Sequence, residues 1–177
     1  DVDTFALQNI YETLPGQESE DITLLLDVGG SKTSLNILQG NISMMMRDNG
    51  SGTHQIIEEI AGRFETDIET AQKIFQDSVA DAPDPQVMAS ILHDIADLWC
   101  SEISDAVHTF LSNTDDARID KIVLSGGGAY VQGFAENLKE ELEADVFTIE
   151  PFGGLYVDEK KFPQTFISRV GPQAPIA

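Results

Sequence analysis

Two glycine-rich segments contain the residues of this sequence that are best suited to chemistry. The first is DVGGSKT over residues 27–33, and the second is SGGG over residues 125–128. Each follows a short apolar run, so each would lie at the carboxyl end of a strand. Glycine lets backbone amides approach phosphate oxygens because no Cβ is in the way. A carboxylate at a strand end, here Asp27, can hold Mg2+ through water. Either segment alone is also typical of an ordinary turn, so their pairing and order carry the argument.

Other reactive side chains do not form a recognisable site in the sequence. The histidines His54, His93 and His108 have no metal-ligand spacing with the one cysteine, Cys100. We expect these histidines to be surface or half-buried side chains. The nucleophile elbow of many serine hydrolases, Gly-x-Ser-x-Gly, does not occur. The sequence therefore favours neither a metal centre nor a hydrolase of that type.

Composition and charge limit the classes of function further. The 177 residues are 41% hydrophobic and 23% charged, which is ordinary for a globular domain. The formal net charge of −21 would repel a phosphate backbone, which excludes nucleic-acid binding across the whole surface. A single cysteine excludes an internal disulfide. The acidic excess is interpreted as a solubility feature.

A hydrophobic period of two predicts a three-stranded antiparallel meander near the N-terminus. Its strands are expected at residues 22–26, 33–38 and 42–47. Gly40-Asn41 is a good two-residue hairpin turn because both residues tolerate positive φ. Met45 points away from Met44 and Met46, which favours core filling over a methionine-rich binding surface.

Helices are expected on both sides of this meander. The first covers residues 3–14, and its apolar spacing is carried by Phe5, Ile10 and Leu14. After Gly52 the period changes to that of helices, expected at residues 53–64, 67–75 and 86–111. Thr66 and Glu69 form a candidate capping box for the second of these.

The longest helix, over residues 86–111, has an apolar stripe that should face the Ile56, Ile57 and Ile60 side of its neighbour. The members of this stripe are Val87, Ile91, Ile95, Leu98, Ile103, Val107 and Phe110. Trp99 is interpreted as a residue at the edge of the core, with a partner anchor as the alternative. A strand at 121–124, a helix at 131–143 and a strand at 145–149 then complete a βαβ unit.

These elements predict an α/β fold, with one mixed sheet, flanking helices and a helical insertion. Strands 22–26 and 121–124 should share the sheet, and the two glycine turns should lie at the same edge. Ligands of open α/β sheets bind at the carboxyl ends of strands. The order of elements is therefore typical of a nucleotide-binding lobe.

The two glycine motifs resemble those of the actin-like ATPases, which include actin, chaperone ATPases, sugar kinases and the division protein FtsA. DVGGSKTSLNIL is similar to their second phosphate motif, and IVLSGGGAYVQGF to their adenosine motif. The resemblance is closer to the PilM family of type IV pilus assembly proteins. It rests also on residues 1–9 as a hinge helix, on Met46-Arg47-Asp48 as a strand-end turn and on Glu150-Pro151-Phe152.

This resemblance covers essentially the whole chain and implies the second lobe of an actin-like (ribonuclease-H-like) protein. Residues 1–15 would be the hinge helix, 20–52 and 117–177 the core subdomain, and 53–116 the inserted helical subdomain. The first lobe would be missing. The closing residues 174–177 look like the start of a last helix that is cut short.

The resemblance also implies a set of site residues. Asp27 would organise Mg2+ through water. Gln72 would replace a glutamate that grips the ribose, Phe75 would replace a lysine, and Lys73 could substitute from a shifted position. The glycine turns would bind the rest of the nucleotide: Gly29, Gly30 and Ser31 the β- and γ-phosphates, and Gly126, Gly127 and Gly128 the α-phosphate and adenosine.

The implied function is that of a cytoplasmic, ATP- and Mg2+-binding component under the inner-membrane platform of the pilus machine. Such a protein acts as a scaffold on the cytoplasmic tail of the membrane protein PilN, largely through the missing lobe. Self-association is left open. No residue stands out as a base for activating water, so at most weak ATPase activity is expected, and none from this chain alone. The alternatives are an FtsA-like filament-forming protein of the cytoskeleton and a sugar-kinase-type phosphotransferase lobe.

Overall fold

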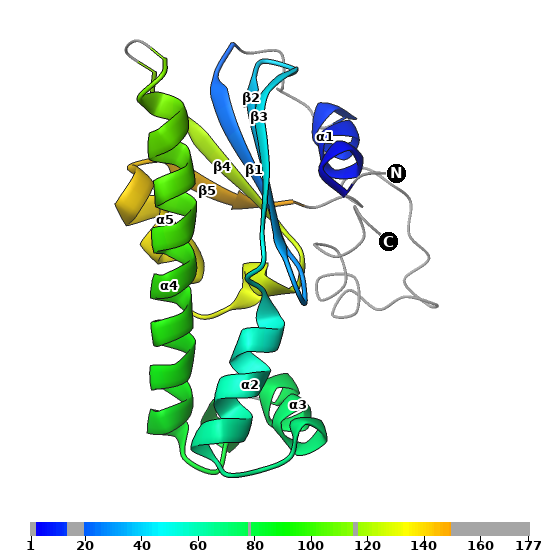
Figure 1. Ribbon diagram of the computed structural model, residues 1–177, viewed down its shortest axis with the longest axis vertical. Coiled ribbons are helices and arrows are strands. Elements are labelled where there is room, and N and C mark those ends of the chain that lie inside the picture. Colours follow the sequence, from blue (N-terminus) through cyan, green and yellow to red (C-terminus); the bar gives the residue numbers. More distant parts are fainter. Residues whose placement is uncertain (1–2, 14–19, 78, 115–116, 150–177) are drawn as a thin grey trace.

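A five-stranded mixed sheet forms the centre of the molecule (Figure 1). The computed structural model describes residues 3–13, 20–77, 79–114 and 117–149. The strand order is β3-β2-β1-β4-β5. The strands are β1 (Ile22–Val28), β2 (Thr33–Gln39), β3 (Ile42–Asn49), β4 (Lys121–Ser125) and β5 (Asp145–Thr148).

The central strand, β1, determines this arrangement. Leu24, Leu25 and Leu26 are all fully buried, because helices cover both faces of the sheet there. β1 pairs antiparallel with β2 and parallel with β4, and Leu24 lies opposite both Ile37 and Ile122. The predicted meander and the shared sheet are therefore confirmed.

Most helices lie on one face of the sheet, and one helix lies on the other (Figure 1). The first face carries the long helix α4 and the shorter α5, while α2 and α3 extend beyond one end of the sheet (Figure 1). The opposite face carries α1. The bounds are α1 (Asp3–Thr13), α2 (Thr53–Arg63), α3 (Ile68–Gln76), α4 (Pro85–Leu111) and α5 (Phe134–Leu142), with 3-10 turns η1 (Val79–Asp81) and η2 (Gly127–Tyr130).

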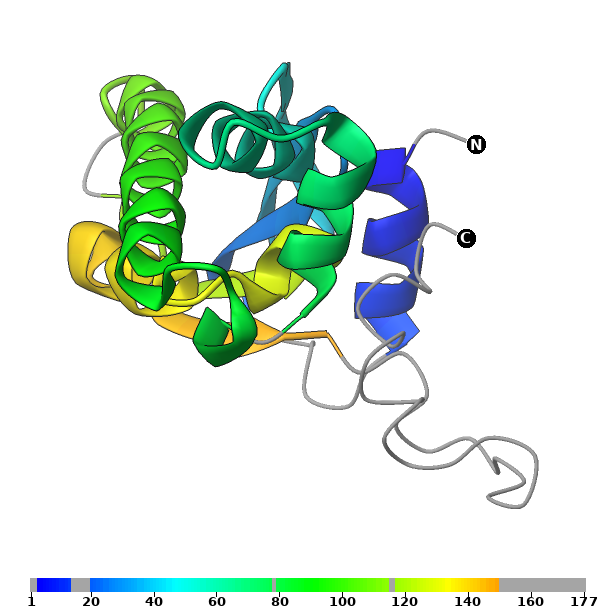
Figure 2. The ribbon, with the colours of Figure 1, turned by 90° about the horizontal axis from the view of Figure 1, so that it is seen from below.

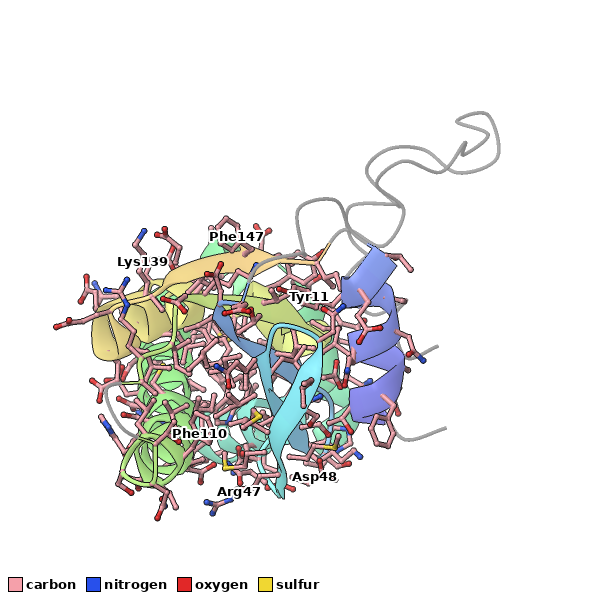
Figure 3. The ribbon with its side chains drawn as sticks, turned by 90° about the horizontal axis from the view of Figure 1, so that it is seen from above. Tyr11, Arg47, Asp48, Phe110, Lys139 and Phe147 are labelled. Carbon is pink, nitrogen blue, oxygen red and sulfur yellow. The ribbon has the colours of Figure 1, made fainter. Side chains whose placement is uncertain are left out.

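Strand alternation divides the apolar side chains between two cores. Leu24 and Leu26 belong to the large core under α4, whereas Leu25 belongs to a small core under α1. In the small core the Tyr11 hydroxyl lies 3.1 Å from Thr23 Oγ1, and Figure 3 shows Tyr11 between α1 and the sheet. Alternate side chains of β1 thus pack into the core on each face of the sheet.

The buried side of α1 differs from the prediction. Leu7 and Tyr11 are buried and Ile10 packs against the small core as expected, whereas Phe5 is 48% exposed, and Leu14 lies outside the described residues. Apolar residues occur on several sides of this short helix, so the sequence allows more than one buried face. Docking on Leu25 and Val123 selects the Leu7–Tyr11 side.

The long helix also buries a slightly different side from the one expected. Ile91, Ile95, Trp99 and Ile103 form a buried series at four-residue spacing, while Leu98 is 44% exposed. Leu98 was expected to pack against α2, and that expectation is wrong. Leu98 follows Ile95 by three residues, which is less than the 3.6 residues of a full helical turn, so its side chain lies to one side of the buried series.

Two helix starts also require correction. The N-cap of α3 is Asp67, whose side chain accepts a 2.9 Å hydrogen bond from the Thr70 amide, and not Thr66. The helix expected at 131–143 begins only at Phe134, after η2. In β3, Met45 points away from Met44 and Met46, as predicted, but of the three only Met45 packs against the core, while Met44 and Met46 are exposed. No helix among the described residues is long and apolar enough to cross a membrane.

Candidate nucleotide-binding site

The two glycine turns lie at the same end of the sheet. Asp27 at the end of β1 pairs with Ser125 at the end of the parallel strand β4. The chain therefore leaves both strands in the same direction, and Figure 2 looks onto this end. The prediction that both turns share one edge is confirmed.

The second turn packs directly against the end of β1. A Cβ on Gly126 would lie 2.4 Å from the Val28 carbonyl oxygen and 2.8 Å from Asp27 Oδ1, and Gly126 has φ +83°. A Cβ on Gly128 would lie 2.2 Å from Val28 Cγ1. Only glycine fits at either position, because any side chain would push the two turns apart.

The first turn is held by the beginning of α2. The Thr53 amide donates to the Gly29 carbonyl at 3.0 Å, and the His54 amide donates to the Gly30 carbonyl at 2.8 Å. The Gly29 amide donates within the turn to the Lys32 carbonyl at 2.9 Å. The Gly29 amide is thus already used to shape the turn.

The Asp27 carboxylate lies between the two turns. It is 7% exposed, with Oδ1 directed toward Gly126 and Oδ2 toward Gly29. Within the described part of the chain, no group of three or more histidine, cysteine or acidic side chains could enclose a metal ion. A single carboxylate fits Mg2+ that keeps most of its waters and is held also by phosphates.

A cavity of about 350 Å3 opens beside the second turn. Such a volume is at the low end of small-molecule pockets. Phe75 from α3, Met88 and Leu92 from α4, and Gly127 and Tyr130 from η2 line it. Asp77 and Gln132 add two polar side chains to a mostly apolar and aromatic lining, which suits a flat, weakly polar group such as a nucleobase.

The residues expected near the ribose are only partly brought to this cavity. Phe75 lines it, but Gln72 is exposed on α3 and is not among the described lining residues. Lys73 forms an exposed ion pair with Glu69 at 2.8 Å along the same helix. The structure therefore gives no support to a ribose grip by Gln72 or Lys73.

Trp99 links the two turns, which was not predicted. Gln55 Oε1 accepts hydrogen bonds from Trp99 Nε1 at 2.7 Å and from the Gly52 amide at 3.3 Å. A Cβ on Gly52 would lie 2.6 Å from the Gly30 carbonyl oxygen, and the Trp99 ring lies 3.3 Å from the position of a Gly128 Cβ. The only sequence signal was that a buried tryptophan needs a hydrogen-bond acceptor.

His54 is a second residue that sequence reasoning missed. Its side chain is exposed, but Nε2 would lie 2.9 Å from a Cβ on Gly30, so the imidazole covers the first glycine turn. The contact between His54 and Gly30 depends on the tertiary structure, because the whole β2–β3 hairpin separates the two residues in the sequence.

The remaining histidines and the cysteine lie elsewhere. His93, His108 and Cys100 line a groove of about 600 Å3 between α4 and α5. Burial, followed by the charges of Asp97 and Glu141, raises the pKa of the Cys100 thiol to about 12. A thiol of such pKa is protonated at neutral pH, which makes it a poor nucleophile and metal ligand.

Comparisons with solved structures place this fold among the actin-like proteins. A chain of a PilM–PilN type IV pilus biogenesis complex superimposes with a TM-score of 0.83 and is 22% identical, over 99% of this chain and 49% of that chain. The archaeal actin homolog Ta0583, in complex with ADP, gives 0.64 and 15%, over 96% and 56%. MreB5 of Spiroplasma citri, bound to AMPPNP, gives 0.59 and 15%, over 81% and 52%.

These likenesses establish the fold, and they show that the chain spans about half the length of each of these proteins. A family model adds the more specific result. The model described as type IV pilus assembly protein PilM matches residues 1–172, nearly the whole chain. The chain belongs to the type IV pilus assembly protein PilM family.

Proposed function

We propose that this chain is one lobe of a PilM-like protein that binds Mg-ATP between this lobe and a second one. The observation that carries the proposal is the contact between the two glycine turns, with the Asp27 carboxylate between them and a mostly apolar cavity beside Gly127. Phosphates would lie on the turns, the base would enter the cavity, and Mg2+ would be held through water near Asp27.

The likeness to proteins whose structures contain ADP or AMPPNP supports this proposal. When bound, Mg2+ would neutralise the charge on the phosphates. The turns themselves would contribute backbone amides, whose positions are already held by α2 and by Trp99. The net charge of −21 opposes a polyanion, so the local donors must outweigh the overall field.

The pilus context follows from the family and from the likeness to PilM in its complex with PilN. The longer protein would act as a cytoplasmic scaffold, peripheral to the inner membrane, on the cytoplasmic tail of PilN. The tail would bind mainly to the other lobe. Binding of a synthetic PilN tail peptide to the full-length protein, but not to this chain, would support this division.

Catalysis is proposed to be weak at most, because the described part of the site offers no evident base near the phosphate turn apart from the exposed His54. An FtsA-like role in filaments is the main alternative, since MreB and the archaeal actin homolog share the fold. Nucleotide-dependent sedimentation of the full-length protein would favour that alternative.

Calorimetric titration tests the nucleotide proposal. We expect the full-length protein to bind ATP in the presence of Mg2+, and this chain alone to bind it far more weakly, because half of the phosphate donors would be missing. Gly127→Ala should weaken binding by placing a methyl group in the cavity, where no atom lies within 4 Å of the new Cβ. Gly62→Ala, which also has no atom within 4 Å of its Cβ but lies in α2 and does not line the cavity, is the matched control. Absence of binding by the full-length protein would refute the proposal.

A further inference from the structure

Three polar side chains form one row across the end of the sheet. Asp27 in β1 lies directly opposite Ser34 in β2 and directly opposite Ser125 in β4. Residues in such register point to the same face, so all three side chains point to the face that carries α1. Their exposed fractions are 7%, 1% and 0% for Asp27, Ser34 and Ser125.

This row differs from the remainder of the same face. Next to it lie apolar side chains such as Leu25 and Val123, which pack under α1. The buried polar groups farther along the face have partners: Thr23 pairs with Tyr11 at 3.1 Å, and the Asn36 amide oxygen accepts from Ser43 at 2.6 Å.

Ser34 is the exception. Among the described residues, its Oγ is the one buried side-chain oxygen or nitrogen that has no hydrogen-bond partner. A buried hydroxyl without a partner destabilises the folded chain, because its hydrogen bonds to water are lost and not replaced. Native proteins retain few such groups, and one of the usual reasons is a water or an ion that binds the group.

The neighbouring charge indicates which ligand the hydroxyl would meet. Directly opposite side chains on paired strands have Cβ atoms about 5 Å apart, so Ser34 lies beside the Asp27 carboxylate. A phosphate oxygen in that place would be repelled by the carboxylate. A cation and its bound waters would be attracted by the carboxylate. A serine oxygen has two lone pairs, so it can accept a hydrogen bond from such a water.

Building on the proposed function, we infer that Ser34 helps to hold the hydrated Mg2+ that accompanies the nucleotide, through one of the waters bound to the metal. Its Oγ accepts a hydrogen bond from a metal-bound water, while the Asp27 carboxylate accepts from another. Mg2+ dehydrates reluctantly and is commonly held by one or two carboxylates plus phosphates, so contacts through its waters suit a row with one carboxylate. Ser125 closes the row on its other side.

The test combines the thermal midpoint without ligand with the affinity for ATP in the presence and absence of Mg2+. A purely structural role of Ser34 would change the midpoint and would not change the Mg2+ dependence. Ser34→Ala removes an unpartnered buried hydroxyl, so the thermal midpoint of this chain without ligand should stay the same or rise. In the full-length protein, the affinity for ATP with Mg2+ should fall about threefold to tenfold, as expected for one hydrogen bond. The affinity measured in EDTA should not change.

Ser104→Ala is the matched control, because Ser104 is also buried but donates to Glu141 at 3.0 Å, away from the glycine turns. This variant should lower the midpoint and leave the Mg2+ dependence unchanged. If the wild type binds ATP and Ser34→Ala keeps the same Mg2+ dependence, the inference is wrong. A clear loss of stability in Ser34→Ala also overturns it, since the hydroxyl would then be structural. If the wild type binds no ATP, the proposed function fails, and this inference with it.

Discussion

Replacing Gly128 by alanine should separate the two glycine turns. The new Cβ would lie 2.2 Å from Val28 Cγ1 and 2.6 Å from Val28 Cβ, whereas carbon atoms in contact prefer about 3.5 Å or more. Val28 is fully buried, and the new Cβ would also lie 3.3 Å from the Trp99 ring. The turn must therefore move by about 1.3 Å, the difference between 3.5 and 2.2 Å.

Overpacking of this kind costs about 1–3 kcal/mol of unfolding free energy. For a chain of this size that corresponds to a fall of about 2–12 °C in the thermal midpoint. Gly127→Ala is the neighbouring control, because no atom lies within 4 Å of its Cβ. It should stay within about 0.5 kcal/mol of the wild type.

Thermal and urea unfolding of the three proteins, followed by circular dichroism, would measure these differences. In a double variant with Val28→Ala, the losses should be less than additive, since the closest contact is removed. Equal midpoints for Gly128→Ala and Gly127→Ala would show that the second turn does not rest on Val28, and would refute the account of the site.

Three further predictions concern the framework of the site. Ile95→Ala should lower the free energy of unfolding in urea by about 2–5 kcal/mol, because Ile95 is 7% exposed. Leu98→Ala should lower it much less, because Leu98 is 44% exposed. Equal losses would contradict the buried series of α4. Asp67→Ala should destabilise the chain more than Thr66→Ala, and the difference should shrink as pH falls. Hydrogen bonds from Thr70 hold the pKa of Asp67 below its usual value. The stabilisation by the Asp67 carboxylate is therefore complete above the ordinary aspartate pKa, and it is lost as the pH falls through the lowered pKa of the folded state. With a thiol pKa of about 12, Cys100 should react slowly with a disulfide reagent at pH 8 and rapidly in urea; rapid reaction of the folded protein would show that it is accessible.

The sequence was sufficient for the order and type of the main elements. Alternation over 33–38 and 42–47 and the apolar run at 22–26 predicted three paired strands, because a buried sheet requires that pattern. The switch to helical spacing after Gly52 predicted the insertion. A strand followed by glycines at both Asp27 and Ser125 predicted two turns at one edge, because the chain leaves parallel strands in the same direction.

The sequence was less reliable wherever the pattern allowed two answers. Helix α1 carries apolar residues on several sides, so Phe5 and Leu7 were equally plausible core residues. Asp67 and Thr66 are both good caps, and only the hydrogen bond to the Thr70 amide distinguishes them. Leu98 and Trp99 are adjacent on α4, but only Trp99 is buried, packed edge-on against Phe134 and hydrogen-bonded to Gln55.

Local sequence thus determined the strands, the helices and the two glycine turns, because backbone preference and apolar period act over a few residues. Tertiary structure alone decided which distant side chains meet at those turns. His54 covers Gly30, Gln55 joins Trp99 to Gly52, Phe75 lines one cavity with Gly127, and Ser34 stands unpartnered beside Asp27. Such contacts depend on strand register and on where each helix docks, and both are set by the packing of the whole core.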